Sequence, residues 1–292
     1  MSAVLPLFGF CSGLLLATTA YSQTLKAFFS SVLSRVLIPV VIIYNMVFYQ
    51  AGSLGLMLFS FFSAIFLFVI YLLLSKDRLQ SLCFSYTNMA WLGFPIAIAL
   101  FGENISASII ALYIGGSIFG NVWAVASVSS APLNVGDIAR KVLKSPPVIA
   151  LCVAALFRLF QVQHLIDHDV FDLIYQCCKW GMVFTGMSVL GMWLRKTQLH
   201  LEDLTYSLKV AMLKVVCGLI FCTLSYYYLP IAHIKDNIGV MFLFFCLPPA
   251  ANIVALETHY QGTGVSAKYI AAGTVVSCAV CLIYGVVLHF VI

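Results

Sequence analysis

Long uninterrupted runs of apolar residues constrain the fold of this chain more than any other feature. The segments 54–74 and 267–292 are two such runs, and neither shows a polar face. Hydrophobic types make up 63% of the 292 residues and charged types 9%, which leaves a water-soluble domain no means of covering its apolar surface. Membrane barrels alternate polar and apolar residues, and these runs do not. The sequence therefore predicts an all-α polytopic membrane protein with the lipid bilayer as its surroundings.

Charged and turn-forming residues divide the chain into about ten expected transmembrane helices. A helix that crosses the hydrocarbon core needs about 20 apolar residues, so the length allows roughly nine to eleven crossings. The first apolar segment has no positively charged start, and we expect it to be helix 1 rather than a removable signal peptide. The expected spans are 3–21, 27–49, 54–75, 80–100, 106–129, 147–162, 172–194, 206–229, 238–258 and 265–290.

Basic residues gather in the connections that follow odd-numbered spans. Lysine and arginine accumulate on the cytoplasmic side of membrane proteins, so these connections are expected inside and both termini extracytoplasmic. The net charge of +5 follows from this topology and requires no nucleic-acid partner. The basic residues concerned are Lys26, Lys76, Arg78, Arg140, Lys141, Lys144, Arg195, Lys196 and Lys209.

The longest polar connection falls near the midpoint of the chain. It covers 131–147, contains three prolines, and has the composition of a cytoplasmic linker between the halves 1–130 and 148–292. Each half holds five expected spans. Because five is odd, the second half enters the membrane from the opposite face, which is the geometry of an inverted repeat.

The fourth and ninth spans, which hold corresponding places in the two halves, both carry proline in their interior. The fourth span contains Pro95 and the ninth contains Pro248 and Pro249. Proline has no N–H and clashes with the preceding turn, so each helix is expected to unwind at its proline. The separation, 248 − 95 = 153 residues, is close to half of the chain, as a duplication requires.

Such breaks favour an anionic ligand. Where a helix restarts, its free N–H groups and the positive end of its dipole face the break, and both attract a carboxylate. The side-chain amides of Asn88 and Asn252 can donate to the same ligand without adding buried charge. A small organic anion is therefore the expected partner of these residues.

At these residues the sequence resembles the auxin efflux carrier family, which includes bacterial malate and malonate permeases and plant auxin exporters. The resemblance covers the whole chain. It depends on the spacing of Asn88 and Pro95, on Phe101-Gly102, and on the segment 247–252 with Tyr260. Plant exporters insert a long loop between the halves, whereas this chain has only a short connection, so auxin itself is a less suitable substrate.

The resemblance implies two inverted five-helix repeats, broken helices 4 and 9 that cross, and an elevator-type carrier in which a transport domain moves against a scaffold. It also implies a transporter of the bacterial inner (plasma) membrane that moves a carboxylate or dicarboxylate. The substrate-binding residues carried over are Asn45, Asn88, Gly93, Pro95, Asn121, Ser188, Pro248, Pro249 and Asn252.

Three of the charged residues inside the expected spans bear on a binding site. Lys179 and Lys214 have no acidic residue within one helical turn, so each either reaches the membrane surface, faces water where it can bind the substrate, or meets a counter-ion. Lys179 would add a second cation for a doubly charged substrate. Glu257 follows the break of helix 9 and either relays protons or extends toward the cytoplasm.

Other classes of protein remain as alternatives. A sodium-coupled carrier of the bile-acid symporter type would need acidic ligands at the crossing, and a membrane receptor would have no need of broken helices. Catalytic motifs are missing, so no enzyme is expected, and neither a cofactor nor a metal site is expected, because the ten cysteines lie mostly in apolar runs. A homodimer, the coupling ion and the direction of transport are left open.

Overall fold

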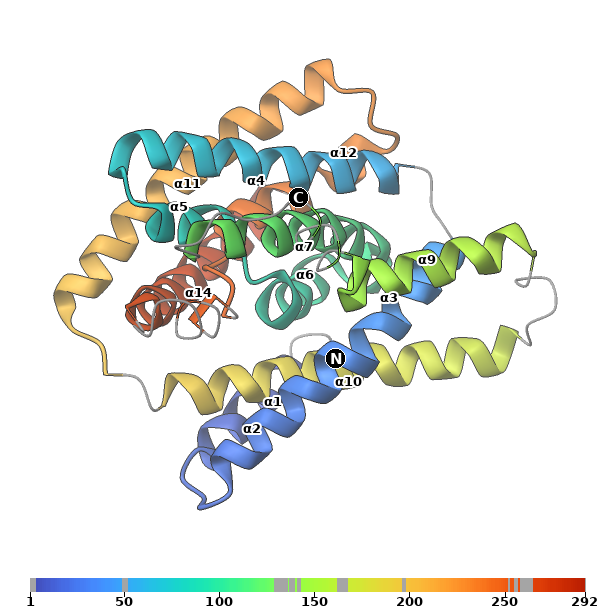
Figure 1. Cartoon of the computed structure of the whole chain (residues 1–292), viewed down its shortest axis with the longest axis horizontal. Coiled ribbons are helices and arrows are strands. Elements are labelled where there is room, and N and C mark those ends of the chain that lie inside the picture. Colours follow the sequence, from blue (N-terminus) through green and yellow to red (C-terminus); the bar gives the residue numbers. More distant parts are fainter. Residues whose placement is uncertain are drawn as a thin grey trace. The chain divides into compact units, whose positions relative to one another are not determined.

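The computed structural model of the protein describes residues 4–48, 52–128, 136, 140, 143–161, 168–195, 198–251, 253–254, 257 and 265–291. Within these ranges the chain is helical, and the only extended pairing is an isolated antiparallel bridge between Thr87 and Pro249. The predicted all-α class is therefore confirmed (Figure 1).

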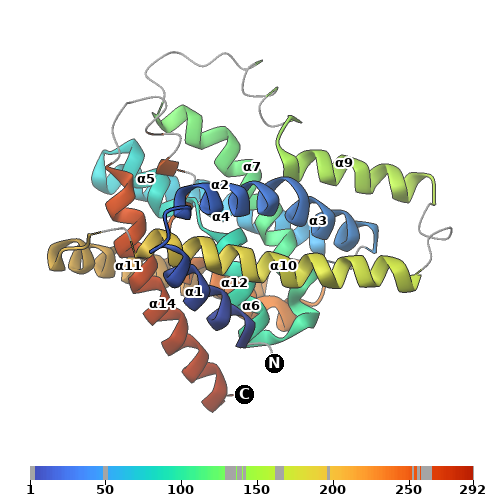
Figure 2. The same ribbon diagram turned by 90° about the horizontal axis from the view of Figure 1, so that it is seen from below.

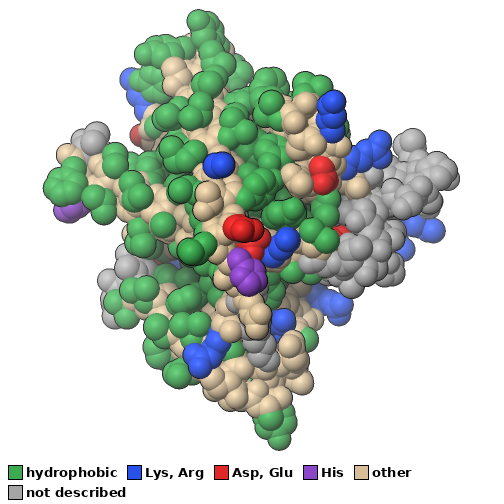
Figure 3. Space-filling view, turned by 90° about the vertical axis from the view of Figure 1, so that its left-hand side faces the viewer, with side chains coloured by type: hydrophobic (Ala, Val, Ile, Leu, Met, Phe, Trp, Pro, Cys, Tyr) green, Lys and Arg blue, Asp and Glu red, His purple; other side chains and the backbone are tan. Residues whose placement is uncertain are grey.

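Four helices in the described part of the chain are long and apolar enough to cross a membrane. Shorter apolar helices cover Val4–Leu16, Met89–Phe101 and Pro146–Leu159. Large hydrophobic side chains are exposed along the long helices, and the face in Figure 3 is covered mainly by such side chains. Lipid is the solvent in which this exposure is favourable. The membrane-length helices are Ser22–Val47, Ser53–Ser75, Leu201–Tyr228 and Ser266–Phe290.

The helices cluster into two compact units, each built from separate stretches of the chain. Unit 1 comprises Met1–Ser53, Ala90–Ile110 and Leu143–Lys196, and unit 2 comprises Leu54–Met89, Ala111–Val142 and Thr197–Ile292. Each unit therefore takes helices from both halves of the sequence. The expected linker 131–147 lies mostly outside the described residues.

In unit 1, helix α1 (Val4–Leu16) packs along α10 (His168–Leu194). Gly13 allows the close approach, because a Cβ atom there would lie 2.1 Å from the carbonyl oxygen of Ser188. Helix α3 (Ile38–Val47) packs on α9 (Pro146–Leu159), and Figure 2 shows both pairs. The remaining elements that lie at least in part in unit 1 are α2 (Ser22–Val32), η1 (Leu33–Leu37), η2 (Met89–Gly93), α6 (Phe94–Phe101) and η3 (Glu103–Ile105).

In unit 2, helix α11 (Leu201–Tyr228) packs against both α12 (Ile234–Cys246) and α14 (Ser266–Val291), and α14 also contacts α5 (Arg78–Ser85). Asp77 caps α5, since its side chain accepts hydrogen bonds from the backbone N–H groups of Leu79 and Gln80. The unit is completed by α4 (Ser53–Ser75) and by α7 (Ser106–Val128), whose first turn belongs to unit 1.

The prediction that helix 4 unwinds at Pro95 is wrong. Pro95 lies near the start of α6, and the π-helical turn η2 precedes it without a break. A π-helical turn shifts the hydrogen-bonding partners by one residue, so the carbonyl that proline leaves without a donor can be accommodated. Pro39 in α3 follows the π-helical turn η1 in the same way. The chain instead leaves the helix at Tyr86–Asn88, about seven residues earlier.

Candidate functional site

The broken segments of spans 4 and 9 pair with each other in unit 2. The backbone N–H of Asn88 donates to the carbonyl of Pro248, and that of Ala250 donates to the carbonyl of Tyr86, each at 2.8 Å. Thr87 and Pro249 stand opposite each other between these two bonds. Each break therefore supplies backbone partners that the other has lost, which allows both helices to unwind in an apolar environment.

Two consecutive prolines end α12 and begin the break of span 9. Leu247, which precedes them, has an extended backbone (φ −79°, ψ 149°), as steric contact with a following proline ring requires. The last carbonyl groups of α12 consequently lack helical donors and carry the partial negative charge of a helix C-terminus.

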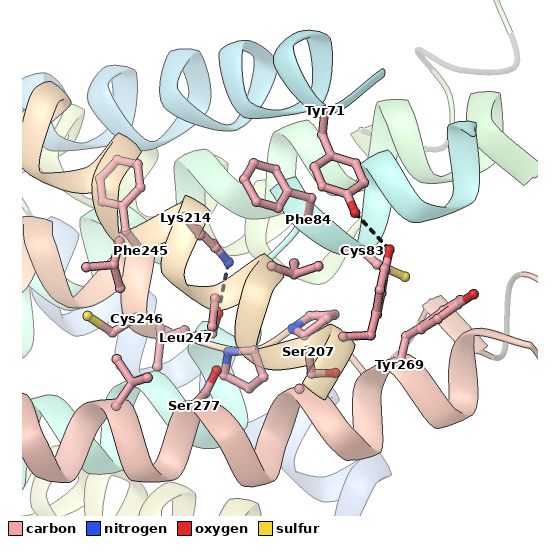
Figure 4. Close-up of a pocket in the computed structure, with 18 of the residues that line it drawn as sticks. Tyr71, Cys83, Phe84, Ser207, Lys214, Phe245, Cys246, Leu247, Tyr269 and Ser277 are labelled. Atoms are coloured by element: carbon pink, nitrogen blue, oxygen red, sulfur yellow. Dashed lines mark hydrogen bonds between the residues drawn. The ribbon is translucent and has the colours of Figure 1, made fainter. Parts of the chain in front are cut away.

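Lys214 supplies the cation at this helix end. It lies on α11, its residue surface is 4% exposed, and its Nζ donates to the carbonyl oxygen of Leu247 at 2.9 Å (Figure 4). This burial contradicts extension of Lys214 to the membrane surface, which was one of the interpretations that the sequence left open. An ammonium group at a helix C-terminus is electrostatically favourable, which reduces the cost of burying it.

The Lys214 ammonium borders a cavity formed entirely by residues of unit 2. The cavity comprises about 560 Å³ of space that protein atoms do not fill, and part of this space is open to solvent. It has room for a few water molecules or for one carboxylate group. The cavity is lined by Tyr71, Gln80, Cys83, Phe84, Tyr206, Ser207, Val210, Ala211, Lys214, Val215, Phe245, Cys246, Leu247, Pro248, Pro249, Tyr269, Gly273, Ser277 and Val280.

Hydroxyl groups from two helices form a chain beside Lys214. The hydroxyl oxygens of Tyr71 and Tyr206 lie 2.7 Å apart, and Tyr206 donates to Oε1 of Gln80 at 2.8 Å. Tyr206 also contacts the ring of Tyr269, with ring centroids 5.4 Å apart. The wall of the cavity thus combines neutral hydrogen-bonding groups with aromatic surface, a lining suited to a small organic molecule.

Lys214 is the only charged residue among the described residues that line the cavity. Of the ten acidic residues in the chain, all but Asp137 and Asp167 are described, and none of the described ones lines it. A buried ammonium without a carboxylate partner is a favourable place for a ligand that brings a negative charge. The described residues also contain no group of three His, Cys, Asp or Glu side chains that could hold a metal ion.

Glu257 lies in unit 2 and is fully buried, which contradicts one of the two interpretations of its sequence position, extension toward the cytoplasm. Its two carboxylate oxygens accept from the backbone N–H groups of Val265 and Ser266, each at 2.8 Å, and one of them also accepts from the Ser266 hydroxyl. These donors stand at the N-terminus of α14, where the helix dipole favours an anion. Glu257 therefore anchors the start of α14.

Lys179 has a partner that the sequence did not reveal. Its Nζ lies 2.5 Å from Oε2 of Glu103, within unit 1, and the side chains of the two are 2% and 44% exposed. The rings of Tyr175 and Trp180 flank the ammonium at 5.4 and 5.3 Å. Of the possibilities that the sequence left open for Lys179, the structure shows a counter-ion, which lies far away in the sequence and already neutralises the ammonium charge.

The other expected site residues divide between the two units. Unit 2 holds Asn88, Pro248 and Pro249, which the paired breaks bring together, and Lys214, whose contact with Leu247 lies next to them. Two further asparagines give no side-chain information, because Asn252 lies outside the described residues and only the backbone of Asn121 is described.

The site residues of unit 1 make contacts of a structural kind. Asn45 donates through Nδ2 to the carbonyl of Val41 at 2.7 Å, and Ser188 donates to the carbonyl of Gly9 at 3.0 Å. Gly93 and Pro95 belong to the continuous helix that follows the break. Tyr260, part of the resemblance, is outside the described residues.

Sequence reasoning missed most of the cavity wall. One side of α11 carries polar residues about two helical turns apart, with Tyr206 and Ser207 at one level and Lys214 at the next. Such a polar stripe on a membrane helix was the signal that the sequence offered. Gln80 and Tyr71 gave no such signal, because their role depends on contacts with α11. A comparison of the sequence with protein-family models finds no match, and a comparison with curated proteins also finds none.

Proposed function

We propose that this protein is a carrier that moves a small organic anion, a carboxylate, across a membrane. The observation that carries the proposal is the cavity in unit 2, where a buried ammonium faces an internal space with no acidic residue among its described walls. Burying a lone charge is unfavourable, and a carboxylate that pairs with it supplies the missing negative charge. The cavity thus combines one strong electrostatic contact with neutral donors from tyrosine and serine.

The pairing of the breaks supports the inverted-repeat part of the proposal. Helix α5 ends at Ser85 and α12 ends at Cys246, a separation of 246 − 85 = 161 residues. The opposed residues Thr87 and Pro249 are separated by 249 − 87 = 162 residues. The two neighbouring landmarks give offsets that differ by one residue, which is the relation expected of two repeats that meet at their breaks. The 153-residue separation of Pro95 and Pro248 is not the offset between the repeats, because helix 4 breaks before Pro95.

The composition of the two units also supports a duplicated architecture. Unit 1 contains expected spans 1 and 2 from the first half and spans 6 and 7 from the second half. Unit 2 contains span 3 and most of span 5 from the first half, and spans 8 and 10 from the second half. The first and second spans of each half therefore belong to unit 1, and the third and fifth spans of each half belong mainly to unit 2. The broken fourth and ninth spans do not follow this rule after their breaks. In the ten-span arrangement that we propose, two such units provide the transport domain and the scaffold of an elevator mechanism in a bacterial inner membrane.

Substitution of Lys214 tests the proposed function directly. We expect Lys214→Met to abolish uptake of short carboxylates by proteoliposomes, because the pairing charge is lost, while Lys214→Arg retains part of it. Thermal unfolding of both variants in detergent checks that they fold. Binding is read from the rise in melting temperature with added carboxylate, since a ligand of the native state stabilises it.

Two results would count against the carrier proposal. One is a rise in melting temperature with neutral or cationic compounds and with no carboxylate. The other is carboxylate uptake by Lys214→Met at the rate of the unmodified protein. Uptake measured with choline in place of sodium addresses the coupling ion, and a strict requirement for sodium would favour a sodium-coupled carrier.

A further inference from the structure

We infer that the cavity in unit 2 selects carboxylates with a single negative charge and rejects dicarboxylates of the same carbon skeleton. This inference rests on the proposed function, because it assigns a charge class to the anion of the same site. It depends on the number and sign of the charges around the cavity, and each of these can be located in the structure.

Among the described residues of the lining, one side chain offers a ligand a positive charge. Lys214 is the only charged residue among the described residues of the lining. Part of its charge is already offset, because its ammonium donates to the carbonyl oxygen of Leu247 at the C-terminal end of α12. Of its three N–H groups, this bond uses one, so the others can donate to one carboxylate.

A second carboxylate would find no cation in the cavity. Beyond Lys214, the polar side chains of the described lining are hydroxyl groups, two thiols and the Gln80 amide, and none of these groups brings a second positive charge. Figure 4 labels the hydroxyl-bearing residues Tyr71, Ser207, Tyr269 and Ser277. Burying an unpaired carboxylate is strongly unfavourable, whereas an uncharged amide or hydroxyl of similar shape is satisfied by neutral partners. The lining therefore suits a molecule that is anionic at one end and neutral elsewhere.

Two further charges that the sequence placed inside expected spans, Lys179 and Glu257, do not line the cavity. Lys179, which the sequence offered as a second cation, is bound to Glu103 within unit 1. Glu257 is the buried carboxylate of unit 2, and its negative charge faces the N-terminus of α14. Neither group supplies a positive charge to the cavity.

Matched pairs of ligands separate charge from shape. Malonate, succinate and glutarate each have a half-amide, in which one carboxylate is replaced by an amide of nearly the same size. We expect at least one half-amide to bind the purified full-length protein at neutral pH at least about tenfold more tightly than its parent dicarboxylate, because the cost of one unpaired buried charge exceeds one decade of affinity. The dissociation constants come from melting-temperature titrations and from competition with uptake.

A pair of variants at Gln80 tests the cause of the selection. Gln80→Lys adds a second cation to the wall of the cavity. Both Gln80→Lys and Gln80→Met lose the side-chain oxygen that accepts from Tyr206, so Gln80→Met is the control without added charge. We expect Gln80→Lys to shift the preference toward the dicarboxylate by at least about tenfold relative to Gln80→Met. Because Gln80 is partly exposed, both side chains can be placed, and their melting temperatures check the fold.

The outcomes distinguish this inference from the proposed function. Dicarboxylates that bind as tightly as their half-amides, with binding lost in Lys214→Met, would overturn the charge selection and leave the carrier proposal standing. An unchanged preference in Gln80→Lys relative to Gln80→Met would also overturn it. If no member of any pair binds, the proposed function fails, and the charge selection fails with it.

Discussion

The two lysines that are buried in long helices meet different kinds of oxygen. Lys179 binds the carboxylate of Glu103, and the resulting pair is close to neutral. Lys214 binds the carbonyl oxygen of Leu247, which carries only part of a negative charge, so most of its own charge remains. The first lysine therefore serves the stability of unit 1, and the second remains free to bind an anion.

Removal of the Glu103 charge should destabilise the protein, because it leaves the Lys179 ammonium buried without its partner. We expect Glu103→Gln to lower the free energy of unfolding by about 1–3 kcal/mol, less than for a fully buried pair because Glu103 is 44% exposed. The melting temperature in detergent reports the change. Asp236→Asn is the control, since Asp236 and His233 form an exposed pair whose loss should change stability by less than about 0.5 kcal/mol. Equal effects of the two substitutions would contradict the assignment.

The sequence could reveal the buried lysines but not their partners. No acidic residue lies within one helical turn of Lys179 in the sequence. Its partner Glu103 is 76 residues away, in the short helix η3. Lys214 meets a backbone carbonyl, and no pattern of side chains indicates such a contact. Both partners follow from tertiary packing, and the cavity of unit 2 could not be predicted for the same reason.

At the scale of elements, the apolar runs predicted the helices closely. The expected spans 54–75 and 106–129 became Ser53–Ser75 and Ser106–Val128, because a long apolar segment in lipid must satisfy its backbone internally. The break of helix 4 could not be placed correctly, since it was assigned to proline. Thr87 and its neighbours leave the helix without a proline, and their backbone partners come from residues 248–250.

Two glycines of α7 test how the first break is supported. A Cβ atom at Gly120 would lie 2.2 Å from the ring of Tyr86, whereas at Gly116 the nearest atoms are 3.8 and 3.9 Å away. We expect Gly120→Ala to displace Tyr86, whose carbonyl accepts from Ala250, and to lower the free energy of unfolding by about 1–3 kcal/mol. Gly116→Ala should be neutral or slightly stabilising, because alanine favours a helix. Melting temperatures and carboxylate uptake measure both variants, and equal stability would refute the role of Gly120.

At the scale of the whole molecule, the charge pattern predicts which side of the membrane each connection faces. Alkaline phosphatase, which is active only outside the cytoplasm, should be active when fused after residue 292 and inactive when inserted at 131–147. This result follows because the basic residues Arg140, Lys141 and Lys144 hold the central connection on the cytoplasmic side. Green fluorescent protein at the same sites should give the reverse pattern. Activity of the phosphatase at both sites would exclude the proposed topology.

Composition alone predicted a helical membrane protein, and the four membrane-length helices agree with that class. Composition could not predict how the helices group into two units. The sequence suggests a division at 131–147, but the contacts join helices from both sides of it. The grouping depends on which helix faces pack together. A helix that is apolar on every side has no periodic sequence pattern that indicates which face contacts a neighbouring helix.

The interleaving of the two units has a consequence for biosynthesis. Helices α4 and α5 leave the ribosome early, but α11, α12 and α14, which complete the wall around Lys214, come from the last third of the chain. Until α14 has been inserted, a nascent chain holds a buried ammonium and two opened helix ends without all of their neighbours. The early helices therefore form an incomplete unit during synthesis, the kind of intermediate from which larger proteins misfold or misassemble.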